Sequence, residues 1–143
     1  MSNSVLCAVD ISQPKIETGV LKTAVKLAAM NGAKLDVITV VPDFGMSMVG
    51  SFFEAGHTDK AIANAKEALN AFVKEVLGAE ANADVRHIVA MGSAYEEILK
   101  IAKKAGSDLI VIGAHKPDFK DYLLGPNAAR VVRHSDCSVY VVR

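Results

Sequence analysis

Glycine and polar residues that separate two apolar runs near the end of the chain suggest the clearest chemistry. Gly113 directly follows the apolar run 109–112, and Gly125, Pro126 and Asn127 precede a short helical pattern. A buried strand that leads through a glycine and a loop into the start of a helix is how α/β proteins hold phosphate groups. The first N–H groups of a helix have no partner within it, and the helix dipole favours an anion there. The pattern therefore predicts an anion-binding site.

Each residue of this pattern has a definite role in such a site. Gly113 lets a ligand approach the backbone, because it has no Cβ. With Gly125 as the helix cap, Pro126 becomes the first helical residue, a position that proline favours. Pro126 lacks an N–H group, but Gly125, Asn127 and Ala128 keep theirs. The dipole contributes only about 0.3–1 kcal/mol at exposed sites, so direct hydrogen bonds must supply most of the affinity.

Asp10 is a second polar candidate, and it ends the apolar run 4–9. Open parallel sheets bind ligands beyond the carboxyl ends of their strands, where the strand order reverses. If the strands that lead to Asp10 and Gly113 are neighbours, both residues flank that crevice. Simpler roles compete with these: Asp10 fits a helix cap or an Asx turn, and Gly113 and Gly125 fit plain ends of a strand and a helix. Lys116 fits either a phosphate contact or a solvated loop.

Other site chemistries find no support in the sequence. There is no G-x-x-x-x-G-K-[ST] loop, no G-x-G-x-x-G after the first strand and no G-x-S-x-G elbow. The four histidines show no metal-ligand spacing, so no metal site is expected from the protein alone. Cys7 and Cys137 form no C-x-x-C pair, which favours buried, reduced thiols.

The composition indicates an ordered globular domain. The chain has 143 residues, of which 51% are hydrophobic, and we expect one domain over residues 1–143. Its 16 basic and 16 acidic residues form no basic stripe or polybasic run, which argues against nucleic acid and membrane surfaces as partners. No apolar run approaches the ~18 residues of a membrane span, and no signal peptide is evident. A cytoplasmic location is therefore expected.

Apolar runs and helical repeats alternate along the chain. Short apolar runs, typical of strands, occupy residues 4–9, 34–41, 84–90, 109–112 and 139–142. Helical repeats begin near Pro14, Thr58, Ser93 and Pro126. This alternation predicts an α/β fold, a parallel sheet with helices on both faces and right-handed crossovers. The run 84–90 is the most polar of the five, so we expect it at a sheet edge.

Two local signals refine the helices and loops. Ser93, followed three residues later by Glu96, predicts a capping box at the start of the third helix, and Gly106 predicts its end. Residues 44–57 form a long, irregular connection between a strand and a helix. Loops of this length are usually functional or mobile.

Four segments carry a family resemblance that covers the whole chain. They are residues 9–12 (VDIS), 92–98 (GSAYEEI), 108–115 (DLIVIGAH) and 123–134 (LLGPNAARVVRH). With these segments the chain resembles the universal stress protein family in its small single-domain bacterial form, and it is most similar to the F/G-type branch. The resemblance implies an adenine nucleotide α-hydrolase-like fold. This fold is an open, twisted, five-stranded parallel sheet in the order 3-2-1-4-5, with helices on both faces.

The resemblance also implies a nucleotide site and a dimer. Nucleotide-binding members hold ATP, ADP or AMP, with or without Mg²⁺, at a G-x2-G-x9-G-[S/T] motif. By position, nucleotide contacts are implied for Ala8, Val9, Asp10, Val40, Ile112, Gly113, His115, Lys116, Gly125, Pro126, Asn127 and Ala128. Dimer contacts through strand 5 are implied for Val139, Tyr140, Val141 and Val142. An exposed, valine-rich edge strand suits such pairing, because an uncovered edge presents unpaired backbone groups.

The glycine motif is matched at its two ends and changed in its middle. Gly113 matches the first glycine and Gly125 the last. Lys116 stands at the middle glycine, eight residues separate it from Gly125, and Pro126 replaces the hydroxyl residue. Asp10 matches the acidic residue that meets the nucleoside. The adenosine half of the motif thus keeps the character of the family, while the phosphate half departs from it.

Two function hypotheses follow. The first is a cytoplasmic, nucleotide-binding homodimer of the stress response, with no catalytic residue and at most slow ATP hydrolysis or autophosphorylation. The second is an interaction or scaffold dimer of the same fold that binds no nucleotide. A response-regulator receiver needs an Asp at the end of strand 3, but that strand ends in Val89-Ala90-Met91, which excludes this third class.

Overall fold

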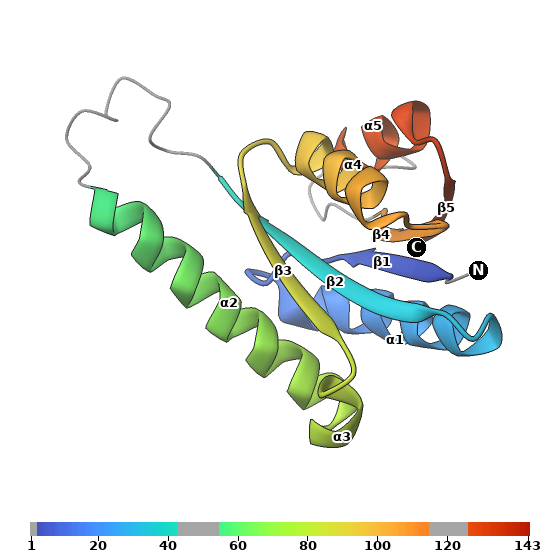
Figure 1. The fold of residues 1–143 in the computed structure, drawn as a ribbon, viewed down its shortest axis with the longest axis horizontal. Helices are drawn as coiled ribbons and strands as arrows, with labels where there is room; N and C mark the ends of the chain where they lie inside the picture. Colours follow the sequence, from blue (N-terminus) through green and yellow to red (C-terminus); the bar gives the residue numbers. More distant parts are fainter. Residues whose placement is uncertain (1–2, 43–54, 115–125) are drawn as a thin grey trace.

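The computed structural model describes residues 3–42, 55–114 and 126–143, and of residues 55–58 it describes the backbone alone. These residues form one sheet of five parallel strands in the order β3-β2-β1-β4-β5 (Figure 1). The strands are β1 (Ser4–Ala8), β2 (Lys34–Val41), β3 (Arg86–Met91), β4 (Leu109–Gly113) and β5 (Ser138–Val142). The predicted α/β class and the strand order implied by the resemblance are both confirmed.

Helices separate the strands along the chain. Within the described ranges they are α1 (Pro14–Met30), α2 (Ala55–Leu77), α3 (Ala79–Asn82), α4 (Ala94–Ala105) and α5 (Pro126–His134). The predicted alternation of strands and helices is confirmed. However, α2 begins at Ala55 rather than near Thr58, and α3 is not predicted, because four residues are too few for a helical repeat to show. Among the described helices there is none whose length and hydropathy would let it span a membrane.

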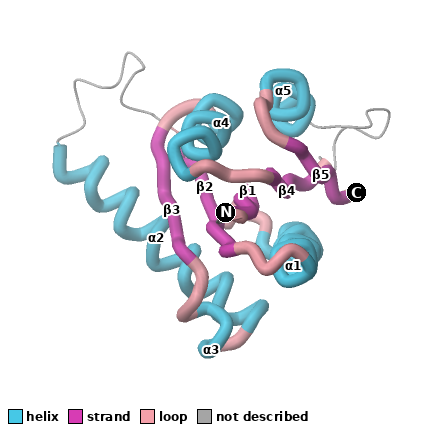
Figure 2. Tube along the Cα trace, turned by 45° about the vertical axis from the view of Figure 1, so that its right-hand side comes forward, coloured by secondary structure: helices cyan, strands magenta, loops and turns pink. Residues whose placement is uncertain are grey.

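β1 is covered by helices on both faces (Figure 2). Its side chains therefore alternate between two cores. Val5, Cys7 and, just beyond the strand, Val9 pack with residues of α1 and α2. Leu6 and Ala8 pack with residues of α4 and α5. Because a strand covered on both faces has no side in contact with water, β1 is apolar from Val5 to Ala8. This explains the continuous apolar run in the sequence.

α1 follows β1 closely, and its first turn therefore lies near the carboxyl end of that strand. Pro14 occupies the first turn, where its missing N–H group has no cost. Val20, Leu21 and Ala24, spaced at three and four residues, are fully buried against the sheet. After α1, Gly32 has a φ of 60°, a left-handed conformation that glycine adopts without steric strain.

β3 and β5 form the two edges of the sheet, and the prediction of a polar edge strand is confirmed for β3. Arg86 of β3 donates two hydrogen bonds to the carboxylate of Asp36 on β2, from Nε (3.1 Å) and from Nη2 (2.8 Å). The hydroxyl of Ser4 on β1 donates a third bond to Asp36 (3.3 Å). A buried carboxylate thus connects three neighbouring strands.

The predicted capping box of Ser93 and Glu96 is wrong. Ser93 is the N-cap of α4, but its side chain makes no capping hydrogen bond, and its carbonyl oxygen accepts the N–H of Glu97 (3.0 Å). The carboxylate of Glu96 instead accepts the hydroxyl of Tyr95 (3.1 Å). Ser93 and Glu96 are both exposed, so water can satisfy the groups that a capping box would pair. Gly106 ends α4 in the left-handed conformation, as predicted.

Candidate functional site

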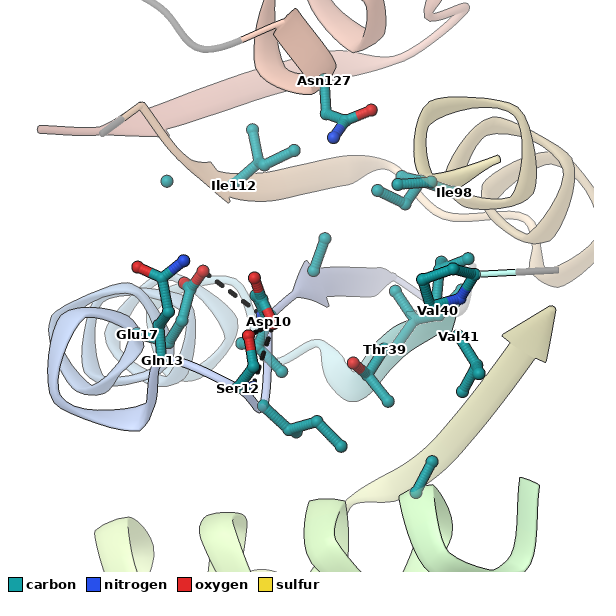
Figure 3. Close-up of a pocket in the computed structure, with 18 of the residues that line it drawn as sticks. Asp10, Ser12, Gln13, Glu17, Thr39, Val40, Val41, Ile98, Ile112 and Asn127 are labelled. Atoms are coloured by element: carbon teal, nitrogen blue, oxygen red, sulfur yellow. Dashed lines mark hydrogen bonds between the residues drawn. The ribbon is translucent and has the colours of Figure 1, made fainter. Parts of the chain in front are cut away.

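A cavity of about 700 Å³ lies beyond the carboxyl ends of β1, β2 and β4 (Figure 3). Helices α1 and α2 border it on one face of the sheet, and α4 and α5 border it on the other. The strand order reverses here, because β1 leads along the chain to β2 on one side and adjoins β4 on the other. Open parallel sheets bind ligands at this point, and pockets for small molecules typically measure roughly 300–1,000 Å³.

Eight of the site residues expected from the sequence line this cavity. They are Ala8, Val9, Asp10, Val40, Ile112, Gly113, Asn127 and Ala128. Pro126 is the first residue of α5, as predicted, but it is exposed and does not belong to the lining. His115, Lys116 and Gly125 lie outside the described residues. The cavity therefore joins the ends of three strands to the start of α5.

Asp10 and Gly113 line the same cavity because β1 and β4 are neighbours. Ala8 at the end of β1 pairs with Ile112 in the parallel register. The residues that follow these two positions therefore emerge on the same edge of the sheet. The expected neighbouring of the two strands is confirmed, and with it the crevice between them.

Asp10 forms an Asx turn and also faces the cavity. The local turn and the place beside the crevice, which the sequence offers as alternatives, are therefore compatible in the structure. Its Oδ1 accepts the backbone N–H (3.0 Å) and the hydroxyl (2.6 Å) of Ser12, which makes an Asx turn. Its carbonyl oxygen accepts the N–H of Gln13 (3.0 Å). These bonds hold the Asp10 carboxylate at the cavity wall, where it remains exposed.

The start of α5 brings both an anchor and a polar group to the cavity. Ala128 is buried in the core between the sheet and helices α4 and α5, which fixes the position of the first helical turn. Asn127 is half-buried, and Figure 3 shows its amide extending from α5 on the side of Ile112 opposite Asp10. The N–H groups of this turn have no partner within the helix.

Many residues that line the cavity are not among the site residues expected from the sequence. The additional lining residues are Ile11, Ser12, Gln13, Ile16, Glu17, Ile38, Thr39, Val41, Pro42, Ala61, Asn64, Ala65, Ala68, Ala94 and Ile98. The helical repeats of the sequence mark Ala65 and Ile98 as inward-facing. They do not show which inward-facing residues border a cavity, because that depends on where each helix crosses the edge of the sheet.

Glu17 is a lining residue with unusual electrostatics. Its Oε1 accepts the backbone N–H of Asp10 (3.3 Å), whereas its Oε2 is buried and has no hydrogen-bond partner among the described residues. Burial raises the pKa of Glu17 to about 7, the bond from the Asp10 N–H lowers it, and the charge of Asp10 raises it. A signal was present in the sequence, because Glu17 precedes the buried Val20 and Leu21 by three and four residues and so shares their helical face.

Neither cysteine belongs to the cavity wall. Cys7 lies fully buried in the core between the sheet and α1, and burial, followed by the charge of Glu17, raises the pKa of its thiol. Cys137 is half-buried, with its Sγ 3.4 Å from the hydroxyl of Ser135. No three His, Cys, Asp or Glu side chains gather for a metal ion within the described part of the chain. Apolar walls with a few polar groups are typical of a binding cavity.

The chain matches a family model described as "Universal stress protein family" over residues 1–143. Universal stress protein G of Shigella flexneri is 39% identical over 59 residues, which are 41% of this chain and 42% of that protein. This match spans less than half the length of that relative. Universal stress protein A homolog 1 of Coxiella burnetii is 28% identical over 138 residues, 96% of this chain and 94% of that protein.

Solved structures share the fold. Protein MJ0577 of Methanocaldococcus jannaschii has a TM-score of 0.78 at 28% identity, over 99% of this chain and 96% of that chain. One further structure is described as a universal stress protein in complex with cAMP. Another is described as the universal stress protein from Archaeoglobus fulgidus in complex with dAMP. Their TM-scores are 0.70 and 0.71 at 21% and 20% identity, over 99% of this chain and 97% and 98% of theirs. Because the family model matches residues 1–143, the chain belongs to the universal stress protein family.

Proposed function

We propose that this protein binds an adenine nucleotide (ATP, ADP or AMP, with or without Mg²⁺) in the cavity and acts in the stress response. The observation that carries the proposal is the cavity itself, which gathers eight expected contact residues at the switch point of the sheet. The family supports it, and so do the two proteins of the same fold that are described as complexes with cAMP and dAMP.

The apolar part of the wall suits the adenine ring. Val40 and Ile112 stand at the ends of β2 and β4, on the two sides of the central strand β1. Ile38 and Ile98 extend this apolar surface toward α4. A flat, apolar ring gains affinity from such walls, while a few polar groups fix its orientation.

Asp10 suits the hydroxyl groups of the ribose. The hydrogen bonds of its turn use Oδ1, which leaves Oδ2 to accept from a ligand. Hydrogen bonds to a charged group contribute roughly 1.5–3 kcal/mol each, which corresponds to about a tenfold or greater change in affinity.

The start of α5 suits the phosphate groups, although Pro126 contributes no N–H group. Asn127 and Ala128 each have a backbone N–H in the first turn, and the amide of Asn127 adds a donor. The missing donor at Pro126 is the observation that favours a second candidate function. This candidate is a stress-response interaction or scaffold protein that binds no nucleotide.

For both candidates we propose a homodimer, paired through β5 with Val139, Tyr140, Val141 and Val142 at the interface, in the cytoplasm. β5 is an edge of the sheet, so one side of its backbone has no partner strand among the described residues. A second copy of the same strand would cover that side.

Nucleotide released from the purified protein distinguishes the two candidates. We expect chromatography of the heat-denatured protein to show an adenine nucleotide. We also expect ATP with Mg²⁺ at about 100 times its Kd to raise Tm by roughly 5–10 °C. The variant Asp10→Ala should lose at least about tenfold in affinity, because the ribose loses a charged acceptor.

Asp84→Ala, an exposed aspartate outside the cavity, serves as the matched control and should bind as the wild type does. Absence of released nucleotide, together with an unchanged Tm at millimolar ATP, would rule out the nucleotide site and favour the scaffold.

A further inference from the structure

The carboxyl group of Glu17 lies in the cavity wall beside Asp10, and within the described part of the chain only one of its two oxygens has a hydrogen-bond partner. Oε1 accepts the N–H of Asp10, and Oε2 is buried without a hydrogen bond among the described residues. Figure 3 shows the side chain on the first turns of α1, with its carboxyl group directed toward Asp10. An ionised carboxylate would leave an unsolvated charge on Oε2, whereas the protonated group is neutral. The surroundings therefore favour the neutral form.

Few charged groups face Glu17 from the elements around it. β1 and the turn after it contribute the buried thiol of Cys7 and the carboxylate of Asp10. The residues of β4, 109–113, include no titratable side chain, and α2 lines the cavity with uncharged residues. Arg143 follows β5, which also contacts α1. Among the described residues, Asp10 is the charged group that acts on Glu17.

We propose that Glu17 determines the charge of the ligand that the cavity accepts, an inference that rests on the proposed nucleotide site. With Glu17 protonated, the carboxylate of Asp10 is the only negative charge among the described residues of this wall, and an anionic ligand is tolerated. With Glu17 ionised, two adjacent carboxylates repel such a ligand. Because burial raises the pKa of Glu17 to about 7, the change occurs near neutral pH.

The size of the effect follows from Coulomb's law. A unit charge about 10 Å from a phosphate group, at an effective dielectric constant of about 20, changes the affinity roughly tenfold. The same charge has little effect on a neutral ligand. The ionisation of Glu17 is therefore expected to select neutral nucleosides over nucleotides at higher pH.

Calorimetric titration with cyclic AMP and with adenosine, at about pH 6 and about pH 8.5, tests this inference. Cyclic AMP is used because its phosphodiester keeps one negative charge at both pH values, whereas the charge of a phosphate monoester changes near its second pKa of about 6. Adenosine is the neutral comparison. The wild type should bind cyclic AMP about tenfold more weakly at the higher pH and adenosine equally at both. In Glu17→Gln the affinity for cyclic AMP should not depend on pH, because glutamine cannot ionise but still accepts the N–H of Asp10.

Glu80→Gln, an exposed glutamate on α3, is the matched control and should keep the pH dependence of the wild type. A wild-type affinity for cyclic AMP that does not change with pH would overturn the inference. So would a pH dependence that persists in Glu17→Gln. Both results would leave the nucleotide site in place. If neither ligand binds at about pH 6, the inference fails, and the experiment with ATP decides the proposed function separately.

Carbon-13 NMR of the glutamate carboxyl groups gives a second readout that needs no ligand. The resonance that disappears in Glu17→Gln should titrate with a midpoint of about 7. A midpoint at the ordinary pKa of glutamate, about 4.3, would overturn this inference but would not affect the proposed nucleotide site.

Discussion

Glu17 and Asp10 are both acidic and lie seven positions apart, yet the fold places them in different environments. Asp10 is exposed, and its carboxylate is stabilised by two hydrogen bonds from Ser12. Glu17 lies on the inner face of α1, where the pairing of one oxygen does not compensate for the burial of the other. At Glu17, burial disfavours the charged form and raises the pKa of the carboxyl group to about 7.

Glu17 should make folding less favourable as the pH rises. In the folded protein its pKa is raised from 4.5 to about 7 by burial, so between these values the folded chain keeps a proton that the unfolded chain has lost. The free energy of unfolding of the wild type should therefore decrease relative to Glu17→Gln between about pH 4.5 and 7, by about 3 kcal/mol at most. Urea denaturation of both proteins across this range measures the difference.

Glu80→Gln tests whether the effect belongs to Glu17, since its side chain is exposed. Its difference from the wild type should stay constant over the same range. A constant difference for Glu17→Gln as well would contradict the raised pKa.

At the scale of elements, Asp36 connects three strands on the β3 side of the sheet. Asp36 is 5% exposed, and its carboxylate accepts hydrogen bonds from Ser4 on β1 and from Arg86 on β3. Asp36 and Arg86 are also direct partners in the parallel register of β2 and β3. The guanidinium group therefore satisfies a carboxylate that water barely reaches.

Arg86→Ala should lower the free energy of unfolding by about 1–3 kcal/mol, because it leaves the buried carboxylate of Asp36 with one hydrogen bond. Combining it with Asp36→Asn should recover part of this loss, since the unpaired charge is then removed. Urea denaturation measures both variants. Arg133→Ala, an exposed arginine on α5, should stay within about 0.5 kcal/mol of the wild type, and an equal effect of both arginines would refute the role of Arg86.

The short helix α3 shows why some elements cannot be predicted from a sequence pattern. Asn82 at its end is buried, although asparagine is usually exposed. Its amide donates to Oδ1 of Asn70 on α2 (2.8 Å), and its own Oδ1 lies 2.6 Å from Nε2 of His87 on β3. α3 is thus held by tertiary hydrogen bonds and not by a helical repeat.

At the scale of the whole molecule, the two edges of the sheet differ in character. β3 carries Arg86 and His87, whereas β5 presents Tyr140, which is 46% exposed, between the half-buried Val139 and Val141. An apolar edge strand is a template for pairing with another chain, while charged residues discourage it. The difference supports β5 as the dimer edge that we propose.

Tyr140→Glu should convert the proposed dimer into a monomer, because it places a carboxylate on the edge strand of each copy, and charged residues on an edge strand discourage pairing. Sedimentation velocity at micromolar concentration measures the change. Met30→Glu, which replaces another exposed apolar side chain but outside β5, should remain dimeric. A wild-type protein that sediments as a monomer would refute the homodimer.

The sequence by itself determined how strands and helices follow one another along the chain. Residues buried on both faces of a strand form apolar runs, and the apolar residues of amphipathic helices repeat at three and four residues. The sequence also identified Asp10 and Gly113 as candidates, because residues at the ends of parallel strands meet at one edge of the sheet. The family resemblance, and not the local pattern, supplied the strand order and residues such as Val40.

Only the tertiary structure decided which other residues complete the cavity and which polar groups change their chemistry there. Ile98 and Ala65 look like ordinary core residues in the sequence, and their place in the wall depends on where α4 and α2 cross the sheet edge. The burial of Glu17 beside Asp10 arises when α1 docks on β1. The physical reason is that burial and hydrogen bonding are set by contacts between elements, whereas a sequence pattern reports on one element at a time.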